Sequence, residues 1–232
     1  MPTEDIHDPR YLVARACHVL ADNGQADMVW GHVSVRDALG RGIWMKSHAL
    51  GFDEIEEDNV LLVSFDGEVL EGEGRRHFEY PIHTEIMRAR GDVNCVVHTH
   101  SVNAVAFAAN GAPLRPISHD ACLFVPPDVA RFTETGDLIR TRELGASLAA
   151  VIADRDAVLI PNHGIATAGD TVGHAVMAAI LLDRACATQL LARDVVGWSS
   201  DEEALAKRAS VWSDEGLEMG WKYLSRHAER NR

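Results

Sequence analysis

Residues 93–101 read VNCVVHTHS, a short apolar run that ends in two histidines separated by one residue. The valines and the cysteine of this run indicate a buried β-strand over residues 93–99. Side chains two positions apart in a strand point to the same face, so the imidazoles of His98 and His100 converge at the carboxyl end of the strand. Two imidazoles in that arrangement can share a metal ion.

A helix is predicted just ahead of this strand, over residues 81–91, because Pro81 suits a first helical turn and apolar residues then recur on one face. Glu79 precedes that helix and follows the basic stretch RRH at residues 75–77. Such a carboxylate can be an acid favoured by the helix dipole. It can equally lie near a metal ion, as a ligand or as a group that moves a proton. The residues alone leave both interpretations open.

A third histidine stands in a comparable place further along the chain. Residues 157–160, AVLI, indicate a short buried strand, and PNHG at residues 161–164 forms a turn. Gly164 allows a close backbone approach there, so His163 can join the pair at the neighbouring strand end. Three neutral imidazoles suit zinc, manganese or another first-row divalent ion and leave positions open for substrate. The competing interpretation is that these histidines are polar residues at strand ends, satisfied by backbone groups.

The rest of the chain alternates between strand and helix patterns, without repeats or a linker, which predicts one α/β domain over residues 1–232. Short strands over residues 33–35, 43–46 and 60–64, with a hairpin at Asp66-Gly67, indicate an antiparallel meander. A further strand is expected over residues 114–118. Helices are expected over residues 9–23, 101–111, 138–152, 170–193 and 201–227.

Composition narrows the functional classes. The 232 residues include 22 Lys and Arg against 35 Asp and Glu, a formal charge of −13, which argues against a nucleic-acid partner. The four cysteines are widely spaced among apolar residues, as expected for free thiols in a reducing compartment. Residues 1–10 lack the hydrophobic run of a secretory signal, and the apolar stretch at 175–182 is too short to span a bilayer. We therefore expect a cytoplasmic protein without a membrane partner.

Four ordered motifs carry a family resemblance: GHVS at residues 31–34, Glu79 with His83 four residues later, VVHTHS at 96–101 and NHG at 162–164. Over residues 9–193 the chain resembles the class II aldolase/adducin family. The resemblance implies a three-layer α/β/α fold with a mainly antiparallel central sheet. It implies a divalent metal held by His98, His100 and His163, and Glu79 as the acid/base carboxylate, which can also touch the metal. It also implies a small-molecule substrate and a homotetramer with active sites between subunits.

The departures from the family pattern concern its phosphate site. Sugar-phosphate enzymes of the family usually have Gly-Asn-x-Ser where this chain has Gly31-His32-Val33-Ser34, and a Ser-Ser pair where it has His77-Phe78. A Ser/Thr-Gly loop is replaced by KSHAL at residues 46–50. A phosphate dianion needs a cluster of hydroxyl and backbone donors, so a phosphorylated sugar is not expected.

The substituted residues indicate a different anion. Arginine offers a planar fork matched to carboxylates, and we expect substrate contacts from His32, Ser34, Arg75 and His77. The alternative is that the arginines lie on a solvated loop. The Gly-His-x-Ser variant is similar to a branch of metal-dependent decarboxylases of hydroxylated aromatic or pyridine dicarboxylates.

The sequence thus predicts a metal-dependent carbon–carbon lyase that releases CO2 through a metal-stabilised enolate or carbanion. Glu79 is the first candidate proton donor, and His119 and Asp120 stand where family members place additional catalytic groups. The sequence contains neither a G-x-G-x-x-G motif nor a Walker loop, and this chemistry requires no organic cofactor. The alternatives are an aldolase or epimerase acting on an unphosphorylated sugar or hydroxy-keto acid, and an adducin-like interaction module without catalysis.

Overall fold

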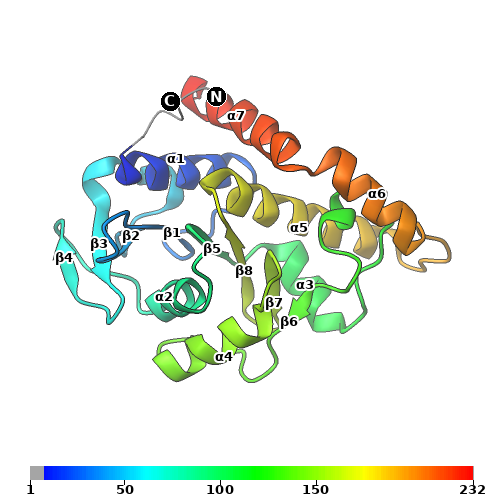
Figure 1. The fold of residues 1–232 in the computed structure, drawn as a ribbon, viewed down its shortest axis with the longest axis horizontal. Coiled ribbons are helices and arrows are strands. Elements are labelled where there is room, and N and C mark those ends of the chain that lie inside the picture. Colours follow the sequence, from blue (N-terminus) through cyan, green and yellow to red (C-terminus); the bar gives the residue numbers. More distant parts are fainter. Residues whose placement is uncertain (1–7, 232) are drawn as a thin grey trace.

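The computed structural model describes residues 8–231, and its centre is one eight-stranded sheet (Figure 1). The strand order is β4-β3-β2-β1-β5-β8-β7-β6, and every neighbouring pair is antiparallel except β6 with β7. The strands are β1 His32–Arg36, β2 Gly42–Lys46, β3 Val60–Ser64, β4 Val69–Glu71, β5 Cys95–Thr99, β6 Ala130–Arg131, β7 Ala157–Ile160 and β8 Gly164–Gly169. The predicted meander corresponds to β1 to β4.

Helices cover both faces of this sheet and make three layers. They are α1 Pro9–Asp22, α2 Tyr80–Ala89, α3 Val102–Asn110, α4 Arg142–Ile152, α5 Val172–Ala192, α6 Asp201–Val211 and α7 Asp214–Arg230. Short 3-10 turns occur at Phe52–Glu54, Glu57–Asn59 and Asp120–Leu123. In Figure 1 α1, α5 and α7 lie above the sheet, and α2 and α4 lie below it. The fold is therefore the expected α/β/α arrangement with a mainly antiparallel sheet.

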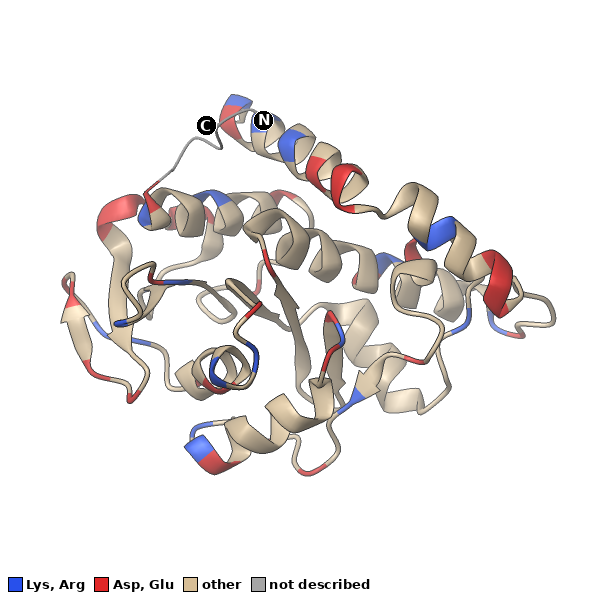
Figure 2. Ribbon diagram, in the orientation of Figure 1, with Lys and Arg blue, Asp and Glu red and all other residues tan. Residues whose placement is uncertain are grey.

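Two apolar cores follow from the alternation of side chains along the strands. Cys95 and Val97 of β5 face the core shared with α1, α3, α5 and α7. Val96, between them, faces the core shared with α2 and α4. Consecutive residues of a strand point to opposite faces, so a central strand with apolar residues on both faces is covered by helices on both sides. Figure 2 shows that Lys, Arg, Asp and Glu lie mostly on the outer helices and loops.

Helix α5 is the longest helix of the described residues and is largely apolar. By length and composition its 21 residues are sufficient to cross a membrane. The sequence prediction considered only the apolar run at residues 175–182 and so underestimated the length of the apolar segment. In the structure 61% of its most apolar window is buried, and the helix packs against β5 and β8 as a core element. The four cysteines are buried and free, as predicted.

Two predicted elements are wrong. Residues 114–118 form no strand, because the N–H groups of Leu114 and Arg115 donate to the side chains of Asp128 and Gln189 and so cannot enter a ladder. The single helix predicted over residues 201–227 is two helices, α6 and α7. Ser213 ends the continuity, because its hydroxyl accepts the N–H of Gly216 and caps α7.

Strand β8 was not predicted, although it is central to the site. Its sequence, GIATAG, is rich in small residues that have low strand propensity. It nevertheless pairs with β5 on one side and β7 on the other, with all six residues buried. The β7–β8 turn is thereby held next to the end of β5.

Candidate metal centre

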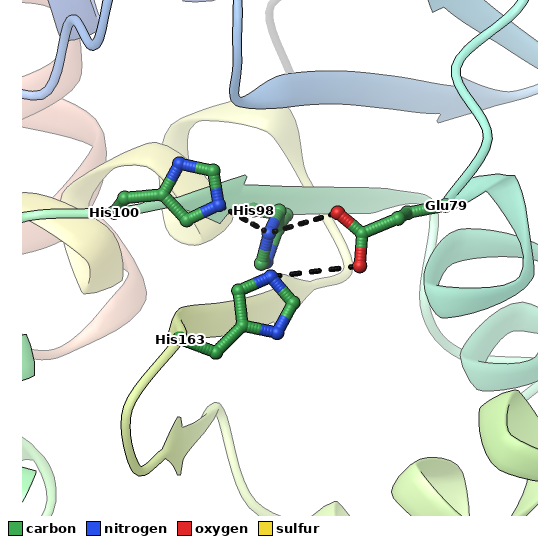
Figure 3. A group of neighbouring side chains, drawn as sticks. All are labelled: Glu79, His98, His100 and His163. Atoms are coloured by element: carbon green, nitrogen blue, oxygen red, sulfur yellow. Dashed lines mark hydrogen bonds and ion pairs between the residues drawn. The ribbon is translucent and has the colours of Figure 1, made fainter. Parts of the chain in front are cut away.

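Four side chains from three parts of the chain converge at one end of the central strands (Figure 3). His98 belongs to β5, His100 follows that strand, His163 lies in the turn between β7 and β8, and Glu79 precedes α2. One ligand atom from each of these four residues lies within 4.8 Å of the other three. The structure thus brings together all four residues that were predicted to surround a metal.

Gly164 permits this convergence. A Cβ atom at this position would lie 2.4 Å from the carbonyl oxygen of Thr99 and 2.9 Å from Cδ2 of His100. Only a residue without a Cβ lets β8 begin this close to the end of β5. This close approach of the two strand ends places His163 beside His98 and His100.

The backbone and one carboxylate orient the two strand histidines. Nδ1 of His98 lies 2.8 Å from the carbonyl oxygen of Ile165, and Nδ1 of His100 lies 3.0 Å from Oδ2 of Asp27. Those oxygens accept, so Nδ1 carries the proton in each ring and Nε2 carries the lone pair. Burial lowers the pKa of both imidazoles, which favours these neutral forms. The two Nε2 atoms face each other at 3.1 Å, a distance that suits lone pairs directed at one cation.

His163 supplies a third free nitrogen. Both of its ring nitrogens are buried, and within residues 8–231 neither has a hydrogen-bond partner. Its Nε2 lies 3.5 Å from Oε1 of Glu79. A buried polar atom without a partner is costly, and coordination of a metal ion would satisfy it. The donor set of three imidazoles and one carboxylate therefore fits a divalent metal ion.

Glu79 stands at the N-cap position of α2, but its side chain makes no capping hydrogen bond. Its Oε1 accepts the backbone N–H of Ile139 at 2.7 Å. Its Oε2 lies 3.8 Å from Nε2 of His98 and 4.0 Å from Nε2 of His32. The carboxylate is thus directed into the histidine cluster, in agreement with the metal-associated interpretation.

A second set of buried polar groups adjoins the cluster on the α2 side. Nδ1 of His32 lies 2.6 Å from Nε2 of His83, and Nδ1 of His83 lies 2.7 Å from Oγ of Ser34. Burial lowers the pKa of His32 well below its usual value and that of His83 to about 3. The ring of His32 also stacks on His98, with ring centres 4.8 Å apart. The motif that contains His83 was noted in the sequence, but no role was predicted for its side chain.

Lys46 is a functional candidate that sequence reasoning missed. It is fully buried at the end of β2, and its Nζ donates to the carbonyl oxygens of Val29 and Leu50 and lies 3.1 Å from Nε2 of His77. Burial lowers the pKa of Lys46 to about 8 and that of His77 to about 2. A lysine within a predicted buried strand was the available signal. Here it holds the loop at residues 46–50 through the carbonyl oxygens of Ser47 and Leu50.

The other predicted site residues lie further out. Arg75 is exposed, with its guanidinium over the ring of Phe78. His119 is exposed, and its carbonyl oxygen accepts from Nε1 of Trp212. Asp120 pairs with Arg184 at 3.0 Å. Within the described residues no contact joins the side chain of His119 or Asp120 to the four candidate metal ligands.

A mainly antiparallel α/β/α fold, with three histidines and a glutamate gathered at one end of the sheet where they could hold a metal ion, is the arrangement of the class II aldolase type. The chain belongs to the family described as Class II Aldolase and Adducin N-terminal domain, whose model matches residues 12–190. Class II aldolases are metal-dependent enzymes.

Relatives and a solved structure agree with this membership. The chain is 31% identical to 3,4-dihydroxyphthalate decarboxylase from Arthrobacter keyseri over 92% of this chain and 91% of that protein. It is 36% identical to the decarboxylase NovR from Streptomyces niveus over 77% of this chain and 66% of that protein. The structure of L-fuculose 1-phosphate aldolase from Glaciozyma antarctica PI12 superposes with a TM-score of 0.85 and 27% identity, covering 96% of this chain and 88% of that one. The resemblance inferred from the four motifs is confirmed.

Proposed function

We propose that this protein is a divalent-metal-dependent decarboxylase of a hydroxylated aromatic or heteroaromatic carboxylate. The observation that carries the proposal is the combination of a complete set of metal donors with a predicted phosphate site in which most of the family's hydroxyl side chains are replaced. His98, His100 and His163 would hold the ion, with Glu79 beside it. Manganese, zinc or another first-row ion suits these donors.

The replaced positions favour a planar acid over a sugar phosphate. Where phosphate-binding members have two serines, this chain has His77, which is buried against Lys46, and Phe78, a residue that is 47% exposed. An exposed aromatic ring beside a polar centre favours packing with a flat ring. The relative at 31% identity is named for an aromatic acid, 3,4-dihydroxyphthalate, which supports the same substrate class. The relative NovR, at 36% identity, is also named as a decarboxylase and supports the reaction type.

The bound ion would supply stabilisation of negative charge on a substrate oxygen as the carbon–carbon bond breaks. Loss of CO2 leaves an electron pair on the ring carbon, and a proton must replace the carboxylate there. Oε1 of Glu79 is occupied by the N–H of Ile139, so Oε2 is the oxygen placed to hold and deliver that proton. His32, whose Nε2 lies 4.0 Å from Oε2, would orient the substrate beside it.

An aldolase acting on a sugar or hydroxy-keto acid is the second candidate. The close superposition with L-fuculose 1-phosphate aldolase favours it, because the fold and family alone do not separate the two reactions. A module without catalysis is disfavoured by the complete set of metal donors, which binding alone would not require.

The test is an assay panel with CO2 detection, using protein reconstituted with manganese or zinc and protein treated with a chelator. The panel contains 3,4-dihydroxyphthalate, other ortho-hydroxy aromatic and pyridine carboxylates, and ketose and aldose phosphates. We expect metal-dependent CO2 release from at least one hydroxy-acid. Efficient cleavage of a sugar phosphate without CO2 from any acid would replace the decarboxylase by the aldolase.

We also propose a cytoplasmic homotetramer with active sites between subunits, acting on a small molecule and not on nucleic acid or a membrane. The charge of −13 supports the absence of a nucleic-acid partner. Light scattering of the purified protein tests the assembly, for which we expect about four times the chain mass of 25.4 kDa.

A further inference from the structure

Two arginines meet at one exposed aromatic ring next to the proposed active site. The guanidinium carbon of Arg75 lies 5.7 Å from the ring centre of Phe78, and that of Arg140 lies 5.6 Å from the same centre. The two arginines are 65 positions apart in the sequence. Arg75 belongs to the loop before α2, and Arg140 to the segment before α4.

The backbone ties this arrangement to Glu79 on both sides. Phe78 directly precedes Glu79, and Arg140 directly follows Ile139, whose N–H donates to Oε1 of that glutamate. The same segment continues past the third histidine, because a Cβ at Gly136 would lie 3.2 Å from the side chain of Asn162. Residues 136–140 therefore run along the edge of the metal cluster, and Arg140 stands at its Glu79 end.

The charges of both arginines are left without an anionic partner. In the described part of the chain the ring of Phe78 is the contact found for either guanidinium. The neighbouring Arg76, by contrast, donates to the backbone carbonyl oxygens of Gly67 and His77. Arg142, two residues from Arg140, faces Glu85 at 3.6 Å and Asp66 at 3.9 Å. In a chain with 35 acidic residues, two unpaired cations at one ring indicate a place for an external anion.

The loop at residues 46–50 packs against the same aromatic ring through His48. The N–H of His48 donates to the carbonyl oxygen of Arg75, and its ring lies against Phe78 with centres 5.5 Å apart. Burial, together with the charges of Arg75 and Lys46, lowers the pKa of His48.

We propose that Arg140 and Arg75 bind a second carboxylate of the substrate, remote from the metal, while the aromatic ring of the substrate packs on Phe78. This inference rests on the proposed decarboxylase function and makes the substrate a dicarboxylate. Arg140 is then a specificity-determining residue. Its planar fork matches a carboxylate, and its contact with Phe78 limits the conformations that must be ordered on binding.

The test measures binding without turnover, by titration calorimetry of metal-loaded protein. The probes are 3,4-dihydroxybenzoate and catechol, which share two adjacent hydroxyls and differ by one carboxylate. We expect the acid to bind about tenfold or more tightly than catechol, the range for a charged hydrogen bond in a site. Arg140→Gln and Arg75→Gln should each weaken binding of the acid about tenfold while leaving the affinity for catechol unchanged. The matched control Arg142→Gln should change neither.

The outcomes separate this inference from the proposed function. Equal binding of the two probes by wild-type protein, or equal losses for both probes in the Arg140 variant, would overturn it. The inference would also be overturned if a sugar phosphate binds more tightly than the acid and loses affinity in the same variants. That result would indicate a phosphate site. A selective loss of affinity for the acid supports the inference even if no hydroxy-acid in the panel releases CO2. The absence of CO2 release would count only against the decarboxylase function.

Discussion

His32 and His83 are joined by a 2.6 Å hydrogen bond between Nδ1 of the first ring and Nε2 of the second. His83 lies on α2, and its other nitrogen is held by Ser34 on β1. The contact fixes the plane of the His32 ring, which stacks on His98 and presents Nε2 toward Glu79. A residue on α2, outside the group of candidate metal donors, thus orients a residue at the edge of that group.

Replacing His83 should therefore impair turnover without removing the metal. We expect His83→Leu to slow the reaction by about 10- to 100-fold, the usual effect of losing a group that orients a site residue. His83→Gln keeps two polar atoms and should retain more activity. Steady-state kinetics and metal analysis of the two variants check this, and equal activity in both would show that the hydrogen bonds are unimportant.

His100 should be essential for metal binding. Wild-type protein should hold about one divalent ion per chain, and His100→Ala should lose both the ion and turnover, because a remaining pair of imidazoles makes a poor site. Elemental analysis after dialysis measures the content. His227→Ala, on the surface of α7, is the control and should keep the wild-type amount. Full activity after chelation would refute the metal site.

Glu79→Gln should slow the chemical step by about two to four orders of magnitude, because the amide cannot exchange the required proton. The amide oxygen can still accept the N–H of Ile139, so the fold should be retained. Substrate affinity should change less than kcat. The control is Glu85→Gln, which removes a buried carboxylate on the same helix that pairs with Arg88. A metal assay shows whether Glu79 is also a ligand.

Gly164→Ala should disturb the site and the fold together. The added Cβ would meet the carbonyl oxygen of Thr99 and the ring of His100, so either β8 or the histidine must shift. Forced overpacking of this kind costs about 1 to 3 kcal/mol of unfolding free energy. We expect weaker metal binding as well. Gly91→Ala adds a methyl group in open space and should change stability by less than about 0.5 kcal/mol.

His174 should make stability depend on pH. Hydrogen bonding and the charges of Asp156 and Asp170 raise the pKa of this imidazole above 6.5 in the folded protein. A base with a raised pKa stabilises the fold fully below its unfolded pKa, and loses that contribution as the pH rises through the folded pKa. His174→Gln should thus cost about 1 kcal/mol or less near pH 6 and still less near pH 9. Denaturant titrations at the two pH values measure the difference, and a cost that grows with pH would contradict the assignment.

Local pattern was sufficient to predict most of the elements. Strand β7 and strand β3 have the predicted bounds, because runs of branched apolar residues between turn residues have few alternatives. The same reasoning failed at β8, whose small residues become a strand only because two neighbouring strands supply partners. It also failed at residues 114–118, where side chains far away in sequence take the backbone hydrogen bonds.

By itself the sequence determined the family, the chemical nature of the donors and the pairing of His98 with His100. The reason is that strand periodicity and residue type are local properties. Only the tertiary structure decided that Glu79 leaves its helix cap free and turns toward the cluster, held by Ile139. The tertiary structure also decided that Arg140 lies over the ring of Phe78, the residue before Glu79. These contacts join residues about 60 positions apart, and the packing of α2 against α4, rather than any local pattern, sets their distances.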